Sequence, residues 1–353
     1  MVKIFVTGAT GQVGSHIVEH LISEKELEIN NAKDIVCLVR NPEKASELKK
    51  LGVTLVKGDL QDSDTIFSTM KEIDYVFHIA ANCLLNQTYE QMYIPNVLGT
   101  RILLEAFIQS NAKCFVYTSS IAVYDSFLGN KRIYHINEDS PIGPLKGEPY
   151  PVTKRIAEGL VTYYAERYPE KVFIITRLGP IIGKGDKQTI PSITSVMSYK
   201  FLPKLINGGR DLFSITSPLD VIRAQIFLAT KGKEVSGQVF NVARDPITYR
   251  EISEAIAEYY GIKPPKFSIK YWFFKLTLPI MKFFKTLFPR VKLLQTATSP
   301  LAVNYIGKSY IYDSSKLKSL GFKYIVSPKD AIHECLKDFD PEKKIIKVKR
   351  KSN

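Results

Sequence analysis

The fold is decided by the stretch Thr7–Gly14, which reads T-G-A-T-G-Q-V-G and lies between a short apolar run and a helical pattern. Glycine allows a tight turn and a close approach of the backbone to a ligand. The amino terminus of the helix that follows favours the charge of a phosphate. The stretch therefore predicts a site for the pyrophosphate of a dinucleotide, with glycines that serve only packing as the alternative. The residues predicted to bind it are Gly8, Thr10, Gly11, Gln12, Val13 and Gly14.

Short apolar runs and helical patterns alternate from this stretch onward. Such runs are typical of buried parallel strands, and the alternation argues for helices on both faces of a sheet. The expected strands are Val2–Val6, Ile35–Val39, Thr54–Val56, Tyr75–Ile79, Cys114–Thr118, Val172–Leu178 and Val239–Val242. The expected helices are Val13–Ser23, Ala45–Leu51, Ser63–Met70, Val97–Ser110, Thr153–Arg167, Leu219–Thr230, Glu251–Tyr260 and Pro328–Leu336. We predict an α/β fold with a doubly wound parallel sheet (a Rossmann fold) and a smaller, discontinuous C-terminal substrate lobe.

The alternation weakens in the second half of the chain, which indicates a change of domain. We expect residues 1–180 to form a dinucleotide-binding domain and residues 212–243 to return to it. The substrate-binding lobe would consist of residues 181–211 and 244–340, followed by a basic tail at 341–353.

Tyr150 and Lys154 are four residues apart, a spacing that puts two side chains on the same face of a helix. An ammonium beside a phenol favours the phenolate and lowers the phenol pKa, so the pair suits acid/base work on an alcohol proton. Ser120 ends a strand-like run, and the carboxyl ends of parallel strands line the ligand crevice. We expect Ser120 to hydrogen-bond the substrate oxygen that Tyr150 protonates. Taken separately, an exposed helix pair and an ordinary strand end are the alternatives.

The end of the second strand indicates which cofactor is bound. A carboxylate there would bind the 2′-hydroxyl of NAD, whereas an arginine suits the 2′-phosphate of NADP. Arg40 follows this strand and no carboxylate occupies the position, which favours NADP(H) and leaves NAD(H) as the alternative. Asp59 and Leu60 follow the third strand and are expected near the adenine. A turn-forming role is the alternative for Asp59.

These motifs stand in the order and spacing of a known family. Beside the glycine stretch they include H-I-A-A from His78, N-V-L-G-T from Asn96, T-S-S from Thr118, Y-P-V-T-K from Tyr150 and the stretch Tyr312–Lys323. The chain thus resembles the extended short-chain dehydrogenases/reductases. The resemblance implies that Ser120, Tyr150 and Lys154 are the catalytic triad, with Tyr150 and Lys154 also beside the cofactor. It further implies that Ala80 lines the cofactor and that Asn96 braces the crossover helix or a proton-relay water.

Two positions narrow the substrate class. Sugar-nucleotide dehydratases carry an Asp-Glu pair after the catalytic hydroxyl, whereas this chain has Ile121-Ala122 there. Nucleotide-sugar enzymes usually place an asparagine after the sixth strand, where this chain has Pro180. The resemblance is therefore nearest to the 3β-hydroxysteroid dehydrogenase and dihydroflavonol reductase branch. It implies a steroid-, lipid- or flavonol-like alcohol or ketone as substrate, with a nucleotide-sugar epimerase and a non-catalytic dinucleotide-binding regulator as alternatives. We expect the loops Cys83–Tyr93 and Asp125–Pro149 to shape the pocket.

The net charge of +14 is concentrated in two C-terminal places. Tyr259–Tyr312 holds nine Lys and Arg residues and no Asp or Glu, and the tail supplies the remaining excess. Within it, Phe267–Leu294 mixes aromatic residues with lysines and has no run of 18 apolar residues, so a spanning helix is excluded. Pro279 and Pro289 are expected to break this stretch into short pieces. It predicts contact with a membrane surface, with a lid over the substrate cavity as the alternative.

The remaining composition is that of an ordinary soluble globular protein, with 45% hydrophobic and 24% charged residues. Cys37 and Cys114 lie in apolar runs, which indicates buried thiols in a reducing compartment. No signal peptide precedes the first strand, and we expect a cytoplasmic protein with peripheral contact at the inner membrane face. We further expect a homodimer, no nucleic-acid partner and no metal site.

Overall fold

The computed structural model describes residues 2–84, 87–124, 131–187, 189–197, 205–288 and 305–337, with Val291, Leu294, Thr298, Val303 and Phe339. Its centre is a seven-stranded sheet in the order β10-β7-β5-β4-β1-β2-β3. All neighbouring strands in this sheet run parallel. They are β1 (Ile4–Thr7), β2 (Ile35–Val39), β3 (Thr54–Lys57), β4 (Tyr75–His78), β5 (Cys114–Ser120), β7 (Val172–Leu178) and β10 (Gln238–Val242).

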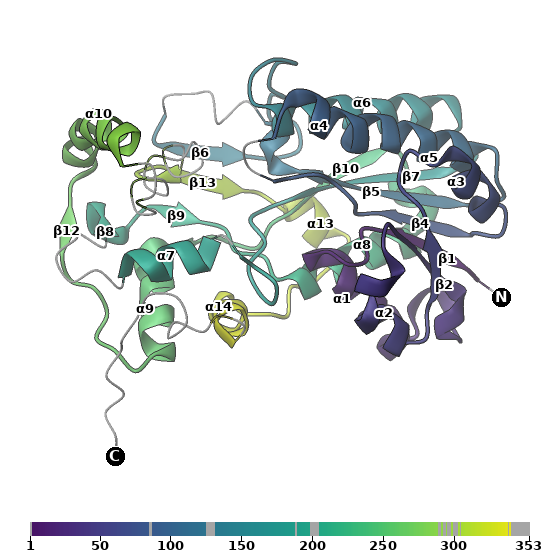
Figure 1. The fold of residues 1–353 in the computed structure, drawn as a ribbon, viewed down its shortest axis with the longest axis horizontal. Coiled ribbons are helices and arrows are strands. Elements are labelled where there is room, and N and C mark those ends of the chain that lie inside the picture. The colour runs from purple at the N-terminus through teal and green to yellow at the C-terminus, as the bar shows by residue number, and fades with distance from the viewer. Residues whose placement is uncertain are drawn as a thin grey trace.

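Helices cover both faces of the sheet (Figure 1). On one face, α1 (Gln12–Glu24) packs against α8 (Pro218–Lys231) in a core that includes β1 and β2 residues. On the other face, α3 (Ser63–Met70), α5 (Gly99–Ile108) and α6 (Pro149–Arg167) form a second core. β1 and β2 are buried along their whole length, which explains why their sequences are continuous apolar runs. The predicted doubly wound α/β fold is confirmed.

The start of α6 is the boundary that matters most for function. The helix begins at Pro149 rather than at the expected Thr153, so Tyr150 lies in its first turn. Proline fits the first helical position because the N–H group there has no intrahelical partner. Most other expected elements agree with the structure to within one or two residues, and α5 is preceded by a π-helical turn over Ile94–Leu98.

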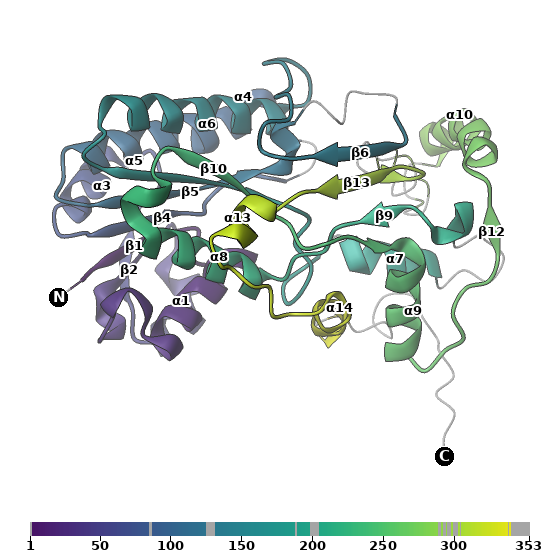
Figure 2. The ribbon, with the colours of Figure 1, turned by 180° about the vertical axis from the view of Figure 1, so that it is seen from behind.

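A smaller region at the end remote from the N-terminus is built from several distant segments (Figure 2). Its paired strands are β6 (Ile133–Ile136) with β13 (Ser309–Tyr312), β8 (Leu205–Ile206) with β12 (Ser268–Ile269), and β9 (Leu212–Phe213) with β11 (Ile247–Thr248). Helices α7 (Thr189–Met197), α9 (Tyr249–Tyr259) and α14 (Pro328–Lys337) share a separate apolar core. The other helices are α2 (Ser46–Lys50), α4 (Tyr89–Tyr93), α10 (Tyr271–Leu287) and α13 (Ser315–Ser319). The domain boundaries proposed from the sequence stay a prediction.

Helix α10 corrects one expectation about the basic aromatic stretch. Pro279 lies inside this helix of 17 residues instead of ending it. Proline removes one backbone hydrogen bond from a helix interior, and packing of the buried Phe274 side chain helps to offset that loss. Pro289 and residues 341–353 lie outside the described part of the chain.

Candidate active site

The glycine stretch forms a tight loop at the carboxyl ends of β1 and β4. Gly8 has a φ of +76°, and a Cβ atom on it would lie 2.7 Å from the backbone nitrogen of Ala80. A Cβ atom on Gly14 would lie 2.2 Å from the carbonyl oxygen of Gly8. Real Cβ atoms do not approach backbone atoms so closely, so only glycine fits at these two positions. The winding of the sheet also reverses between β1 and β4, which is where doubly wound sheets bind their ligands.

The first turn of α1 is open to an anion. Its N-cap residue is Gly11, no side chain caps the free N–H groups, and no acidic residue lies in the first turn. Such a helix end attracts a phosphate through its unpaired donors and its dipole. Gln12 adds a buried side-chain Nε2 without a hydrogen-bond partner, while the Val13 side chain belongs to the core below. These residues fit a dinucleotide pyrophosphate held mainly by backbone groups, with Thr10 exposed at the rim.

A buried chain of hydrogen bonds supports the loop from below. Thr7 Oγ1 lies 2.8 Å from His78 Nδ1, and His78 Nε2 lies 2.9 Å from Thr100 Oγ1. Thr100 donates its single hydroxyl proton to the carbonyl of Asn96, so His78 Nε2 carries a proton and Nδ1 accepts one from Thr7. Burial, reinforced by the charge of Lys154, lowers the pKa of His78 to about 3, which keeps the ring neutral. The supporting role of His78 is not evident from the sequence motif alone.

Asn96 links the loop after β4 to the beginning of α6. Its side-chain oxygen accepts from the backbone nitrogen of Asn82 at 2.7 Å. Its amide nitrogen donates to the Asn82 carbonyl at 3.0 Å and to Thr153 Oγ1 at 3.1 Å. Thr153 in turn donates to the carbonyl of Tyr150 at 3.0 Å. Asn96 is thus in contact with the turn that carries Tyr150, whereas its part in a proton relay stays a prediction.

Ser120 and Tyr150 are brought together by the structure, and the Ser120 hydroxyl lies close enough to the Tyr150 phenol to oppose the rise of its pKa. The Ser120 oxygen also accepts from the backbone nitrogen of Ala122 at 3.2 Å, which fixes its orientation at the end of β5. Both residues keep part of their surface exposed, so a substrate can reach them. Desolvation around the Tyr150 hydroxyl, followed by the nearby Cys83 thiol, raises the pKa of Tyr150 above its ordinary value.

Lys154 occupies a different position from the expected one. Its Nζ donates to the carbonyl oxygen of Thr118 at 2.7 Å and to the Tyr117 hydroxyl at 3.4 Å. The expected lowering of the Tyr150 pKa by this ammonium is therefore wrong for the structure as it stands, because desolvation dominates. Burial also lowers the pKa of Lys154 to about 8, although Cys83 and Glu158 act in the opposite direction.

Glu158 is a site residue that the sequence reasoning missed. Its carboxylate accepts from Ser119 Oγ at 2.7 Å and pairs with the guanidinium of Arg177, whose Nε lies 3.1 Å away. All three side chains are buried, and an ionised carboxylate at such depth needs these partners. The pair therefore holds β5 next to Ser120 against the helix that carries Lys154. A charged residue four positions beyond Lys154, on the same helix face, was the available signal.

Arg155 is a second residue that was missed. Its guanidinium donates to four backbone carbonyl groups, those of Ala122, Val123, Tyr124 and Pro144, at 2.6–3.3 Å. It also packs against Gly143, where a Cβ atom would lie 2.3 Å from Nη2. Arg155 thereby fixes the backbone that follows Ser120 and part of the predicted pocket loop. Residues 125–130 of that loop, and 85–86 of the other one, lie outside the described residues.

The predicted adenosine-side residues lie after the second and third strands. Arg40 is exposed directly after β2. The carboxylate of Asp59 accepts from the backbone and the side chain of Gln61, at 3.3 and 2.9 Å, which is its alternative, turn-forming role. Leu60 is buried against Gly99, where a Cβ atom would lie 2.6 Å from the Leu60 Cβ. Contacts of these residues with an adenosine stay predictions.

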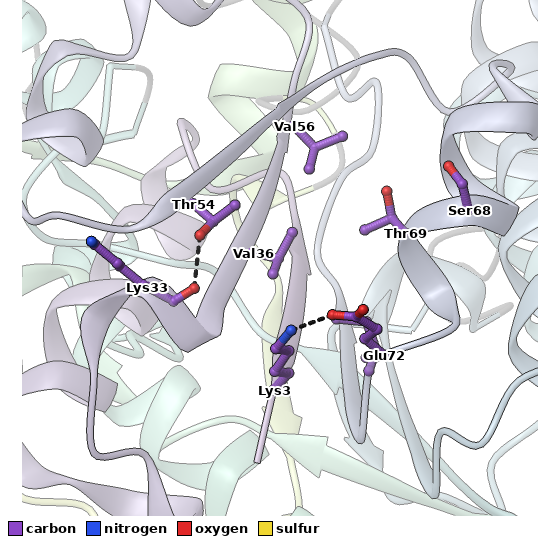
Figure 3. Close-up of a pocket in the computed structure, with 9 residues that line it drawn as sticks. Lys3, Lys33, Val36, Thr54, Val56, Ser68, Thr69 and Glu72 are labelled. Carbon is purple, nitrogen blue, oxygen red and sulfur yellow. Dashed lines mark hydrogen bonds and ion pairs between the residues drawn. The ribbon is translucent and has the colours of Figure 1, made fainter. Parts of the chain in front are cut away.

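A hollow at the opposite edge of the sheet takes no part in this site (Figure 3). It is lined by Lys3, Lys33, Val36, Thr54, Val56, Ser68, Thr69, Glu72 and Ile73. Lys3, Lys33 and Thr54 precede or begin β1, β2 and β3, so the hollow lies at the amino ends of the strands. Glu72 pairs with Lys3 across it, and Thr54 donates to the Lys33 carbonyl at 2.7 Å.

The chain is similar to a known family and to several named proteins. The sequence pattern of the "NAD dependent epimerase/dehydratase family" matches residues 4–243, more than half of the chain. A Bos taurus protein named sterol-4-alpha-carboxylate 3-dehydrogenase, decarboxylating, is 26% identical over 348 residues, covering 97% of this chain and 93% of that protein. An Arabidopsis thaliana protein named 3beta-hydroxysteroid-dehydrogenase/decarboxylase isoform 1 is 26% identical over 352 residues, covering 95% and 79%.

A solved structure supports the fold. UDP-glucuronic acid 4-epimerase from Bacillus cereus, in complex with NAD, aligns with a TM-score of 0.70 and 21% identity, covering 94% of this chain and 97% of that one. At this level of identity the match indicates a shared fold and leaves the substrate open.

Proposed function

This chain belongs to the NAD dependent epimerase/dehydratase family and is an enzyme, and we propose that it interconverts a hydroxyl and a carbonyl group on an apolar substrate. One observation carries the proposal, which is that Ser120 and Tyr150 lie side by side at the carboxyl edge of the sheet. An alcohol oxygen that contacts both hydroxyl groups has a proton acceptor and an orienting partner within reach. The nicotinamide, when bound, accepts or donates the hydride.

The proposed roles follow from the positions of the side chains. Ser120 orients the substrate oxygen, and Tyr150 takes the hydroxyl proton during oxidation and returns it during reduction. Lys154, one turn further along α6, would act beside the nicotinamide ribose, with its ammonium held by the Thr118 carbonyl. Glu158 and Arg155 act through other residues, because they hold β5, α6 and the following loop in place.

An apolar substrate is favoured because two nearby arginine side chains already donate to groups of the protein itself. Arg155 is engaged with four backbone carbonyls, and Arg177 with Glu158 and the Tyr124 hydroxyl. Recognition of a diphosphate relies on arginine or lysine donors, and these two guanidinium groups are already occupied. The sterol-directed names of the relatives and the Ile121-Ala122 pair support the same substrate class.

A nucleotide-sugar epimerase is the second candidate, favoured by the similarity in fold to the UDP-glucuronic acid 4-epimerase. The two functions differ in their redox balance. A dehydrogenase releases one reduced nicotinamide for each alcohol oxidised, whereas an epimerase returns the hydride to its substrate. A non-catalytic regulator would bind the dinucleotide without turnover of any substrate.

The experiment measures reduced nicotinamide during incubation with 3β-hydroxysteroids, other apolar secondary alcohols and UDP-sugars. We expect stoichiometric accumulation with at least one apolar alcohol and none with UDP-sugars. Epimer formation from a UDP-sugar without net reduction of the cofactor would contradict the proposal. Tight cofactor binding with no turnover in either direction, on any of these substrates, would favour the regulator.

A preference for NADP(H) over NAD(H) is part of the proposal. Arg40 and the nearby Lys44 are exposed after β2, and no carboxylate stands at the end of that strand. We expect Arg40→Ala to weaken NADPH binding by roughly tenfold and to leave NADH binding nearly unchanged, since only NADPH carries the 2′-phosphate. An equal loss of affinity for NADPH and NADH would contradict the proposed preference for NADP(H).

No described helix is both long and apolar enough to cross a bilayer. We propose peripheral contact with a membrane surface through α10. A homodimer and a cytoplasmic location are proposed from the sequence.

A further inference from the structure

Exposed large apolar side chains are concentrated on helix α10 and the residues next to it. Ten of the eighteen exposed large apolar side chains among the described residues fall between Phe267 and Val291. The helix lies at the end of the molecule remote from the N-terminus, and both views show it on the outside of the smaller region (Figures 1 and 2). Isolated exposed apolar residues are common on proteins, but a contiguous set of this size marks an interaction surface.

The exposed side chains share one face of the helix. Trp272, Leu276, Phe283 and Leu287 follow one another at intervals of four, seven and four residues, and each is more than half exposed. The apolar face of α10 is hereafter the set Trp272, Phe273, Leu276, Ile280, Phe283, Phe284 and Leu287. The opposite side contains the buried Phe274, which anchors the helix to the rest of the protein. The pattern is therefore the reverse of an ordinary surface helix, which would turn its apolar side inward.

Positive charge lies along one border of this face, and no acidic residue in the surrounding sequence offsets it. Lys275 and Lys282 are exposed, and their spacing of seven residues places them together along one border of the apolar face. No Asp or Glu occurs between Tyr259 and Tyr312. Burial lowers the pKa of Lys308, and the positive charge of the nearby Lys275 lowers it further. An apolar strip bordered by cations is complementary to a surface with anionic headgroups above an apolar interior.

We propose that the apolar face of α10 inserts into the interface of an anionic lipid bilayer, with Lys275 and Lys282 at the headgroups. A second copy of this chain is a poorer occupant, because face-to-face contact would bring the uncompensated lysines of both copies together. A helix of 17 residues is about 25 Å long and lies in the plane of the interface, so no spanning segment is required. This surface is independent of the reaction proposed above.

The test uses the full chain and vesicles in a flotation or co-sedimentation assay, without any substrate. One vesicle population is phosphatidylcholine alone, and the other contains roughly one third phosphatidylglycerol. The apolar variant is Trp272→Ser with Phe283→Ser, and the charge variant is Lys275→Gln with Lys282→Gln. Tyr163→Ser with Ile325→Ser is the matched control, because these side chains are 50% and 60% exposed on other elements. Circular dichroism and melting temperature check that every variant is folded.

We expect the wild type to bind the anionic vesicles and the control to bind them equally well. The apolar variant should lose roughly tenfold or more of the partition coefficient. The charge variant should lose roughly fivefold for each lysine on anionic vesicles, and little on phosphatidylcholine. Equal binding of the wild type and the apolar variant, or no binding of the wild type, overturns the proposal. A dimer that dissociates in the apolar variant, with no vesicle binding, also overturns it and assigns the face to a second copy.

Discussion

The Nζ atom of Lys154 donates a hydrogen bond of 2.7 Å to the backbone carbonyl oxygen of Thr118. This contact joins the helix of the proposed general acid to the strand that ends in Ser120. It also places a cation in the protein interior, since Lys154 is only 2% exposed. The ammonium lies close to the proposed catalytic residues, but its burial as a charge lowers the free energy of unfolding.

Lys154→Met should raise stability relative to the wild type below pH 8 and abolish most activity. Burial lowers the pKa of Lys154 to about 8, so the folded state disfavours the charged form that the unfolded chain carries up to its ordinary pKa of 10.5. The resulting loss of unfolding free energy is fully present below pH 8 and disappears as the pH rises from about 8 to 10.5. It amounts to about 3 kcal/mol at most, reduced by the lost hydrogen bond to Thr118.

The measurement is the unfolding free energy of the wild type and of Lys154→Met from pH 7 to 10.5. Over this range the wild type should gain stability relative to the variant. A stability difference that does not change with pH would show that the lysine is not buried as a charge.

Glu158→Gln should lower kcat by roughly tenfold to a hundredfold and stability by about 3 kcal/mol, because it leaves the buried Arg177 without its charge partner. Glu158 also raises the pKa of Lys154, so removing its charge should shift the corresponding limb of the pH–rate profile to lower pH. A purely structural role would not move that limb. Glu166→Gln, exposed on the same helix, is the control and should leave both the rate and the profile unchanged.

Gly14→Ala and Gly159→Ala form a matched pair of helix glycine substitutions. A Cβ atom on Gly14 would lie 2.2 Å from the Gly8 carbonyl oxygen, whereas one on Gly159 would meet nothing within 4 Å. We expect Gly14→Ala to weaken NAD(P)H binding by roughly tenfold or more, because the loop must move. Gly159→Ala should stabilise the protein by about 0.5–1 kcal/mol with unchanged affinity. Isothermal titration calorimetry measures the cofactor affinity and thermal melting measures the stability. Equal cofactor affinity in both variants would argue against binding of the dinucleotide by the glycine stretch Thr7–Gly14.

The main sheet and the glycine turn were predictable because their signals are local. Apolar runs define buried strands such as Ile35–Val39, and the glycine stretch shows its turn and its helix in consecutive residues. The proximity of Ser120 to Tyr150 also followed from motif order, since both motifs meet at one edge of a parallel sheet.

The supporting residues were not predictable because their roles depend on distant partners. Glu158 looks like a solvated helix residue until Arg177 and Ser119 are placed beside it. The direction of the Lys154 side chain likewise depends on a carbonyl of β5 that no spacing rule reveals. Pro279 shows the same limit, because tertiary packing keeps α10 continuous where local preference would end it.

The central claim is that Tyr150 transfers the alcohol proton, and one comparison tests it most directly. Tyr150→Phe and Tyr163→Phe alter the same residue type on the same helix, but Tyr163 is half exposed and its ring contacts Tyr164 and Arg167. On an accepted alcohol, Tyr150→Phe should reduce kcat by roughly a hundredfold to ten-thousandfold with nearly unchanged NAD(P)H affinity, whereas Tyr163→Phe should behave as the wild type. Wild-type turnover by Tyr150→Phe would contradict the account.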